Sequence, residues 1–202
     1  MATKTTKSIS DFRGALIGGG ARPNLFEVQL ANLPPGISGW DSDNFQYMCK
    51  AAQLPASVIA NIDVPFRGRI FKVAGDRTIE TWSVTVINDE SFKLRNAFEE
   101  WMQLIAKLDT NIGATNPDAY MVDAEVFQLG RGGDQGTQSN SNTGNDSVIL
   151  KQYKMEGIFP TNVAGIDLSY DTGDTIEEFT VEFQVQSFTP YGGVGQANII
   201  QG

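Results

Sequence analysis

The stretch VAGDRTIETWSVTVINDE, residues 73–90, combines a turn, a strand and a helix start within eighteen residues. Its adjacent glycine and aspartate are typical of a turn. From residue 82 to residue 86, apolar and polar side chains alternate, as expected for a strand with one buried face. Asn88 and Asp89 then supply side-chain oxygens that can accept hydrogen bonds from the free N–H groups of a helix start. The stretch therefore predicts a strand that leads directly into a helix.

The helix is expected over residues 88–108, which read NDESFKLRNAFEEWMQLIAKL. Its apolar residues recur at spacings of four and three, which places them on one face. They are Leu94, Phe98, Trp101, Ile105 and Leu108. Such a stripe is typical of a helix packed across a sheet, and no cofactor is needed to explain it. This is the only strong helix pattern in the chain.

Most other patterned segments alternate with a period of two and predict strands. They cover residues 24–30, 44–52, 57–64, 79–87, 121–129, 148–157, 166–170 and 178–186. The connection at residues 65–77 is longer than an ordinary hairpin turn, so we expect it to have a role of its own. Together the segments predict a mainly β domain with one helix.

The chain of 202 residues fits one folded domain with flexible additions. Residues 1–20, rich in Lys, Thr, Ser and Gly, are expected to form a flexible N-terminal arm. Residues 21–190 are expected to form the β domain, with a polar low-complexity loop at residues 130–147. The Gly-rich residues 191–202 are expected to form a loose C-terminal tail.

The net charge is −9, from 15 Lys and Arg against 24 Asp and Glu residues. Tight nucleic-acid binding needs a basic surface, so this charge favours a surface to which nucleic acid does not adhere. No apolar run approaches the roughly 20 residues of a transmembrane helix. The N-terminus lacks the apolar block of a secretory signal. We therefore expect no membrane insertion, and folding in the cytoplasm.

Histidine is absent from the chain, and cysteine occurs once, at Cys49. These counts exclude serine or cysteine triads, histidine-ligated zinc, thiolate zinc and iron–sulfur clusters. Cys49 is expected to be a small buried apolar residue, because no histidine is present to activate it. The glycine-rich residues 130–136 lack the following helix that a phosphate-binding loop requires. We predict no metal and no cofactor.

Two carboxylate pairs are candidates for acid-dependent hydrolysis: Glu178 with Glu182, and Glu99 with Glu100. Residues i and i+4 of a strand lie about 13 Å apart, beyond the roughly 5 to 9.5 Å that glycosidases use. Adjacent helix residues point about 100° apart and do not converge either. Solvated faces explain both pairs better, so we do not expect an enzyme.

Residues 65–72, PFRGRIFK, form the only dense basic and aromatic segment. Phe66 and Phe71 beside Arg67 and Arg69 suit either stacking on nucleic-acid bases or docking on another protein subunit. In the second case, a protruding β-hairpin places its rings on the partner and its arginines near the partner's carboxylates. The acidic charge of the chain favours the subunit contact.

Three segments resemble the tail tube proteins of contractile-tailed, myovirus-type bacteriophages: residues 21–30, 49–90 and 153–183. The motifs VAGDRT, W.VTV.NDE and G.FPTNV, in this order around a single helix, carry a resemblance that spans residues 21–188. The resemblance implies a sandwich-like β-barrel with one flanking α-helix. It further implies hexameric rings, stacked helically into a hollow tube, and no catalytic site.

The resemblance also implies roles for individual residues. The connection at residues 65–77 would reach the adjacent ring, and the candidate stacking residues are Phe66, Arg67, Arg69, Phe71, Asp76 and Arg77. Candidate acidic residues of the lumen are Asp63, Glu178 and Glu182. The implied partners are further copies of the chain, the tail sheath protein, baseplate proteins that initiate the tube, the tape-measure protein, and double-stranded DNA in transit without specific binding. The implied location is the virion tail, after assembly in the cytoplasm of the host bacterium.

Two alternatives stand beside this interpretation. The same ring could belong to a phage-derived contractile injection device, such as a type VI secretion system or a tailocin, which carries no genome. A monomeric β-sandwich that binds glycans is the less favoured alternative, with an exposed Trp40 or Trp82 as the binding platform.

Overall fold

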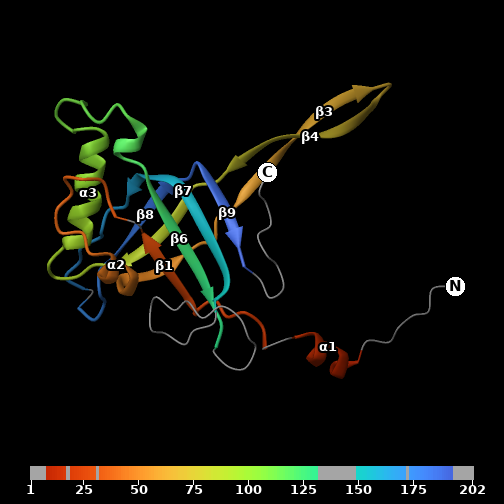
Figure 1. The fold of residues 1–202 in the computed structure, drawn as a ribbon, viewed down its shortest axis with the longest axis horizontal. Coiled ribbons are helices and arrows are strands. Elements are labelled where there is room, and N and C mark those ends of the chain that lie inside the picture. Colours follow the sequence, from red (N-terminus) through yellow and green to blue (C-terminus); the bar gives the residue numbers. More distant parts are fainter. Residues whose placement is uncertain (1–7, 17–18, 31, 132–148, 172, 193–202) are drawn as a thin grey trace.

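The computed structural model describes residues 8–16, 19–30, 32–131, 149–171 and 173–192. Seven strands form one bent sheet, and two more form a separate hairpin that projects from it (Figure 1). The strands are β1 Phe26–Leu30, β2 Cys49–Ala52, β3 Ser57–Phe66, β4 Arg69–Ile79, β5 Trp82–Ile87, β6 Val122–Leu129, β7 Ile149–Val163, β8 Glu178–Gln184 and β9 Ser187–Tyr191. The helices are α1 Ile9–Ala15, α2 Ser42–Met48 and α3 Lys93–Ile105, with a 3-10 turn at Pro117–Ala119. The prediction of a mainly β fold is confirmed.

Strand β7 belongs to both halves of the sheet, whose order is β1-β6-β7-β8-β5-β2 with β9 beside β7. Residues 149–158 of β7 pair with β6 and residues 152–156 with β9, whereas residues 159–163 pair with β8. Gly157 lies where the partners change, with a φ of +65°. Glycine is favoured there because other residues are strained at positive φ. The sheet therefore consists of two half-sheets, β1-β6-β7-β9 and β7-β8-β5-β2, joined through one strand.

The described strands of one chain form an open sheet. β1 and β2 are the two ends of the strand order, and within the described residues they do not pair with each other. The described residues of one copy therefore form two half-sheets that share β7. A closed barrel would need strand pairs that a single copy does not make within its described residues.

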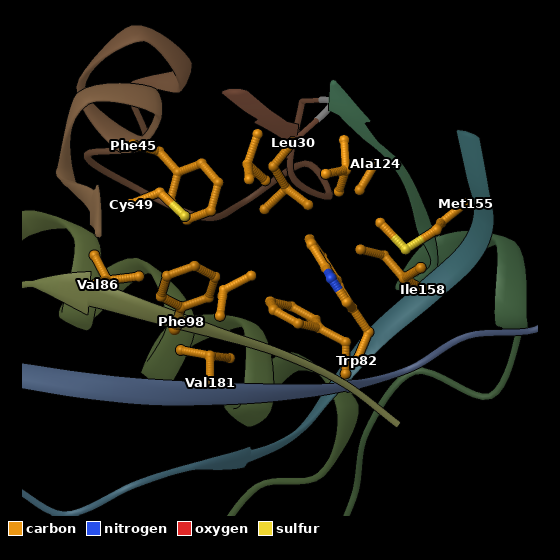
Figure 2. Packing of buried hydrophobic residues seen from close by; sticks show 14 of the residues in the cluster. Leu30, Phe45, Cys49, Trp82, Val86, Phe98, Ala124, Met155, Ile158 and Val181 are labelled. Atoms are coloured by element: carbon orange, nitrogen blue, oxygen red, sulfur yellow. The ribbon is translucent and has the colours of Figure 1, made fainter. Parts of the chain in front are cut away.

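The hydrophobic core lies between the half-sheets and the helices α2 and α3 (Figure 2). Alternating residues of β5 and β8 point into it, as their sequence pattern predicts, and are at most 2% exposed. Phe98 of α3 is fully buried, and five aromatic rings surround it at centroid distances of 5.7 to 6.5 Å. These rings belong to Trp40, Phe45, Trp101, Phe179 and Phe183. The predicted packing of the helix across the sheet is confirmed.

Helix α3 begins later and ends earlier than the predicted residues 88–108, because it spans Lys93–Ile105. Asn88 and Asp89 do not cap it; the residue before the helix is Phe92, with a φ of +53° and no side-chain cap. Asn88 is buried, and its Nδ2 donates to Glu177 Oε2 at 3.0 Å. The asparagine therefore holds the connection between β7 and β8 instead of starting the helix.

The strand predicted at residues 44–52 is wrong in its first half. Helix α2 occupies Ser42–Met48, and the side chain of Asp41 accepts hydrogen bonds from the backbone N–H groups of Asp43 and Asn44. The helical turn places Phe45 in the core, fully buried. Only β2 is extended, and it pairs with β5. The Asp41 cap thus stabilises a helix where the alternating sequence pattern predicted a strand.

Three other segments also differ from the sequence prediction. Residues 65–72 form the tip of a protruding hairpin, as one interpretation of the sequence predicted, but β4 continues through Gly75 and Asp76, where a turn was expected. Residues 166–170 form no strand. The segment before the tail forms β9, which pairs with β7.

The regions expected to be flexible are described only in part. The predicted arm contains α1, whose start is capped by Ser8. The polar loop from residue 132 and the tail from residue 193 lie outside the described residues. None of the helices described here is both long and apolar enough to cross a bilayer.

Candidate assembly surfaces

The β3–β4 hairpin extends away from the half-sheets (Figure 1). All residues of β3 and nearly all of β4 are exposed. Arg67 and Gly68 form the tip, with φ values of +46° and +81°, as in the type I′ turns that join two strands through two residues. The guanidinium of Arg67 lies 5.5 Å from the centre of the Phe66 ring. The hairpin tip therefore presents an arginine next to an aromatic ring.

One face of the hairpin is apolar. Directly opposed residues of an antiparallel pair share a face, and the pairs Ile62–Val73 and Val64–Phe71 lie on this one. We call it the apolar hairpin face; it consists of Val58, Ile62, Val64, Phe66, Phe71 and Val73. These residues are 42% to 66% exposed. Contiguous exposed apolar residues on a soluble protein mark a contact surface.

The opposite face of the hairpin is mixed in character. Asp63 accepts from Lys72 Nζ at 2.8 Å and from Asn61 Nδ2 at 3.1 Å. Ile70 and Pro65 form an opposed pair on the same side, nearer the tip. The ion pair is exposed and contributes at most about 1 kcal/mol. Asp63, a candidate residue of the lumen, therefore lies on the projecting hairpin and not on the sheet.

The structure brings together some of the predicted stacking residues. Phe66, Arg69 and Phe71 share the apolar side near the tip, and Arg67 forms the tip itself. Asp76 and Arg77 lie farther down β4, next to a register shift where residues 75 and 76 face Ala60. Gly75 fits this bulge because a Cβ there would lie 3.0 Å from the carbonyl oxygen of Ala60. The six residues therefore divide into a tip group and a base group.

The other two candidate lumen residues share the outer face of β8. Glu178 and Glu182 alternate with buried residues and point away from the core. Glu178 forms an ion pair with Lys50, and Glu182 accepts a 3.4 Å hydrogen bond from Asn162 Nδ2. Each carboxylate thus has its own local partner, and the two do not converge.

A hollow lies in the connection between β7 and β8, where the sequence pattern predicts no site. It has a volume of about 680 Å³ and is lined by residues 165–170 and 175–178. Three apolar residues of its wall are strongly exposed: Leu168 at 80%, Tyr170 at 108% and Ile176 at 72%. The sequence shows that these residues are apolar, but not that they are exposed. Loop residues lack the periodicity that separates buried from exposed positions.

The tryptophans named for the glycan-binding alternative are not exposed platforms. Trp82 is buried, and its Nε1 donates to the carbonyl of Gln53 at 2.7 Å. Trp40 packs against Phe45 with ring centroids 5.2 Å apart. Trp82 is buried and Trp40 is half-buried, so neither is the exposed platform that the glycan-binding alternative requires.

The helical carboxylate pair is also separated. Glu99 binds the Arg95 side chain, whereas Glu100 accepts hydrogen bonds from the N–H and hydroxyl of Ser38. These bonds from Ser38 lower the pKa of Glu100. Among the described residues, no group of three or more cysteines and carboxylates is arranged to hold a metal ion.

Cys49 is buried, as the sequence predicts. Burial raises the pKa of its thiol from 9.0 to about 12, because desolvation disfavours the thiolate. The folded chain therefore holds the thiol proton more tightly than the unfolded chain does. The resulting contribution to the free energy of unfolding is fully present below the ordinary pKa of 9.0 and is lost as the pH rises toward 12.

We therefore expect Cys49 to be nearly inert toward thiol reagents in the folded protein. At about pH 8, modification should be at least roughly 100-fold slower than in the chain unfolded in guanidinium, because both access and the thiolate fraction are reduced. A time course with a chromogenic disulfide reagent measures both rates. Similar rates in the two states would contradict the buried position of the thiol.

Comparison with known proteins supplies the family. The sequence profile described as phage tail tube protein matches residues 21–190. The tail tube protein gp19 of Enterobacteria phage T4 is 34% identical over 161 residues, which cover 80% of this chain and 86% of that protein. The tail tube protein of Serratia phage KSP90 is 25% identical over 179 residues, covering 88% of this chain and 93% of that protein.

Solved structures share the fold at low sequence identity. The cap of the anti-feeding prophage is 14% identical with a TM-score of 0.57, covering 96% of this chain and 100% of that chain. A chain of the anti-feeding prophage baseplate is 12% identical with a TM-score of 0.55, covering 86% of this chain and 96% of that chain. The sequence match over most of the chain, together with this fold, shows that the protein belongs to the phage tail tube family of contractile phages.

Proposed function

We propose that the chain is the repeating subunit of a tail tube, in which hexameric rings stack helically into a hollow conduit for genome delivery into a host bacterium. The apolar hairpin face is the observation that carries this proposal. Its six residues do not pack against the core of their own chain, because the hairpin projects from the half-sheets. A surface of this kind is useful only when another molecule covers it.

The energetics of the hairpin favour a contact along the tube. A two-stranded hairpin without further packing is only marginally stable in water. Burying one large apolar side chain contributes about 1.5–3 kcal/mol, so covering several of them gives a substantial contact. The hairpin and the surface that receives it are different patches, and such heterologous contacts generate open, repeating assemblies.

The half-sheets supply the second type of contact that a ring needs. β1 and β2 end the strand order, and within the described residues their outer edges have no strand partner. Exposed edges readily pair with strands of another chain. Lateral pairing of this kind would cover the edges and close a ring of identical copies, which supports the ring of the proposed tube.

The charge of the chain suits a conduit. With a net charge of −9, a lumen lined by this protein repels the phosphates of passing DNA instead of binding them. Glu178 and Glu182 on the outer face of β8 remain the proposed lumen residues, because a polar strand face can line a channel. Asp63 on the hairpin belongs to the contact region in this arrangement.

The proposed surroundings follow from the same assembly. The tube lies in the tail of the virion, inside a sheath protein, on baseplate proteins that initiate it, and around a tape-measure protein before DNA enters. It is assembled in the host cytoplasm and is not inserted into a membrane by this chain. No catalytic step is assigned to it.

Electron microscopy of the purified full-length chain tests the proposal. We expect rings or rods of uniform diameter with a central channel, formed either unaided or on tail ends that lack their tube. Analytical ultracentrifugation measures the same assembly in solution. A chain that stays monomeric at high concentration, even with such tail ends present, would overturn the proposed function.

A further inference from the structure

We propose that the hairpin tip of one copy docks into the β7–β8 hollow of the next copy along the tube. The inference rests on the proposed function and names the receiving surface for the hairpin. The tip comprises Phe66, Arg67, Arg69 and Phe71, and the hollow is formed by Asp167, Leu168, Tyr170, Ile176 and Glu177.

The two surfaces lie at opposite ends of one strand pair. Trp82 at the start of β5 faces Phe183 near the end of β8, and Ile87 at the end of β5 faces Glu178 at the start of β8. The hairpin leads into β5 at the first of these ends, and the hollow precedes β8 at the second. In Figure 1 the hairpin accordingly extends to the upper right, away from the region where β8 begins. Copies stacked along this strand pair therefore bring the hairpin of one toward the hollow of the next.

The lengths of the elements allow this contact. At about 3.3 Å per residue, the ten residues of β3 span about 33 Å. The seven residues of β8, which separate the two surfaces within a copy, span about 23 Å. The hairpin is therefore long enough to leave its own body and reach into a neighbouring one.

Both surfaces present apolar residues that their own chain leaves uncovered. Phe66 and Phe71 are each 66% exposed at the tip. Leu168, Tyr170 and Ile176 are 72% to 108% exposed around the hollow. A volume of about 680 Å³ is ample for two aromatic side chains. Mutual burial would remove both apolar patches from water.

The charges of the two surfaces are opposite. Residues 64–72 contain two arginines and one lysine and no acidic residue. Residues 165–177 contain four acidic residues and no lysine or arginine: Asp167, Asp171, Asp174 and Glu177. Opposite charges around an apolar centre are the arrangement expected of a specific protein contact. The same charges disfavour contact between two tips or between two hollows, so they fix the head-to-tail direction.

Disulfide crosslinking tests the contact directly. Arg69→Cys combined with Leu168→Cys, in assembled tubes under mild oxidation, should give a ladder of covalent oligomers on a non-reducing gel. The buried native Cys49 does not compete. Neither single variant should give a ladder. Arg69→Cys combined with Leu108→Cys is a matched control, because Leu108 is 90% exposed but lies outside the hollow.

Charge reversal gives a second, independent readout. Arg67→Glu with Arg69→Glu should abolish tubes at concentrations at which the unmodified chain assembles. Adding Asp167→Lys and Asp171→Lys to that variant should restore them, because the attraction is re-formed with opposite signs.

Separate outcomes distinguish failure of this inference from failure of the proposed function. Tubes without the crosslinked ladder, or without charge-reversal rescue, would show that the tip docks elsewhere and would overturn the inference while leaving the tube intact. Absence of tubes from the unmodified chain would overturn the proposed function and this contact with it.

Discussion

Replacing Phe98 with alanine is expected to lower the free energy of unfolding by about 3–5 kcal/mol. Phe98 is fully buried and lies at the centre of five aromatic rings from α2, α3, β8 and the segment before α2. The change removes the burial of a large ring and leaves a cavity that the surrounding rings cannot fill without moving. Because a domain is stable by only about 5–15 kcal/mol, a large share of the total would be lost.

Chemical denaturation of the unassembled chain, followed by tryptophan fluorescence, measures this loss. Leu108→Ala is the control, because Leu108 is 90% exposed beyond the end of α3 and its truncation should change stability by less than about 0.5 kcal/mol. A loss below about 1 kcal/mol for Phe98→Ala would contradict the central position assigned to this ring.

Replacing Phe71 with threonine is expected to weaken assembly without unfolding the subunit. Phe71 lies on the apolar hairpin face and is 66% exposed in the single chain, so its fold does not depend on the ring. Threonine keeps the preference for a strand. If the ring is buried in the assembled tube, about 1.5–3 kcal/mol is lost per contact. The lowest concentration at which tubes form should therefore rise by about 10- to 100-fold.

Ile70→Thr is the matched control for this prediction. Ile70 is the preceding residue of the same strand and is 63% exposed, but it lies on the opposite face of the hairpin. Its replacement should shift the assembly threshold by less than about threefold. Sedimentation across a concentration series measures both thresholds, and thermal unfolding should show the same Tm for both variants. Equal thresholds would show that assembly does not use the apolar hairpin face.

The sequence predicts those elements whose pattern is set by burial. β5 and β8 alternate because one face of each lies on the core, and the stripe of α3 recurs every three to four residues for the same reason. The alternating pattern wrongly predicted a strand where α2 lies. The short run around Phe45 fits both the strand period of two and the helix period of 3.6, and the Asp41 cap favours the helix. The start of α3 was misplaced because Asn88 bonds to Glu177, a residue far away in the chain. A contact between residues so far apart in the chain cannot be recognised from the local sequence pattern.

The candidate surfaces, too, could be predicted only where the local sequence is distinctive. Residues 66, 67, 69 and 71 were identified from their unusual basic and aromatic composition, and the structure places them at the hairpin tip. A protruding hairpin was one of two interpretations of this segment, but the length of its strands could not be foreseen, because Gly75 beside Asp76 predicted a turn. Gly68 in fact belongs to a tight turn, and Gly75 lies in a bulge of a continuous strand. The β7–β8 hollow was not predicted, because it depends on how a loop without periodicity folds over its neighbours.

The sharing of β7 by both half-sheets has a mechanical consequence. A load on either half reaches the other through one continuous backbone and its rows of hydrogen bonds, and not only through side chains that can slide past each other. Separating the halves requires many such bonds to break together in shear, which makes each subunit a stiff element. A column built from these subunits would resist bending and transmit force from one end to the other with little internal deformation.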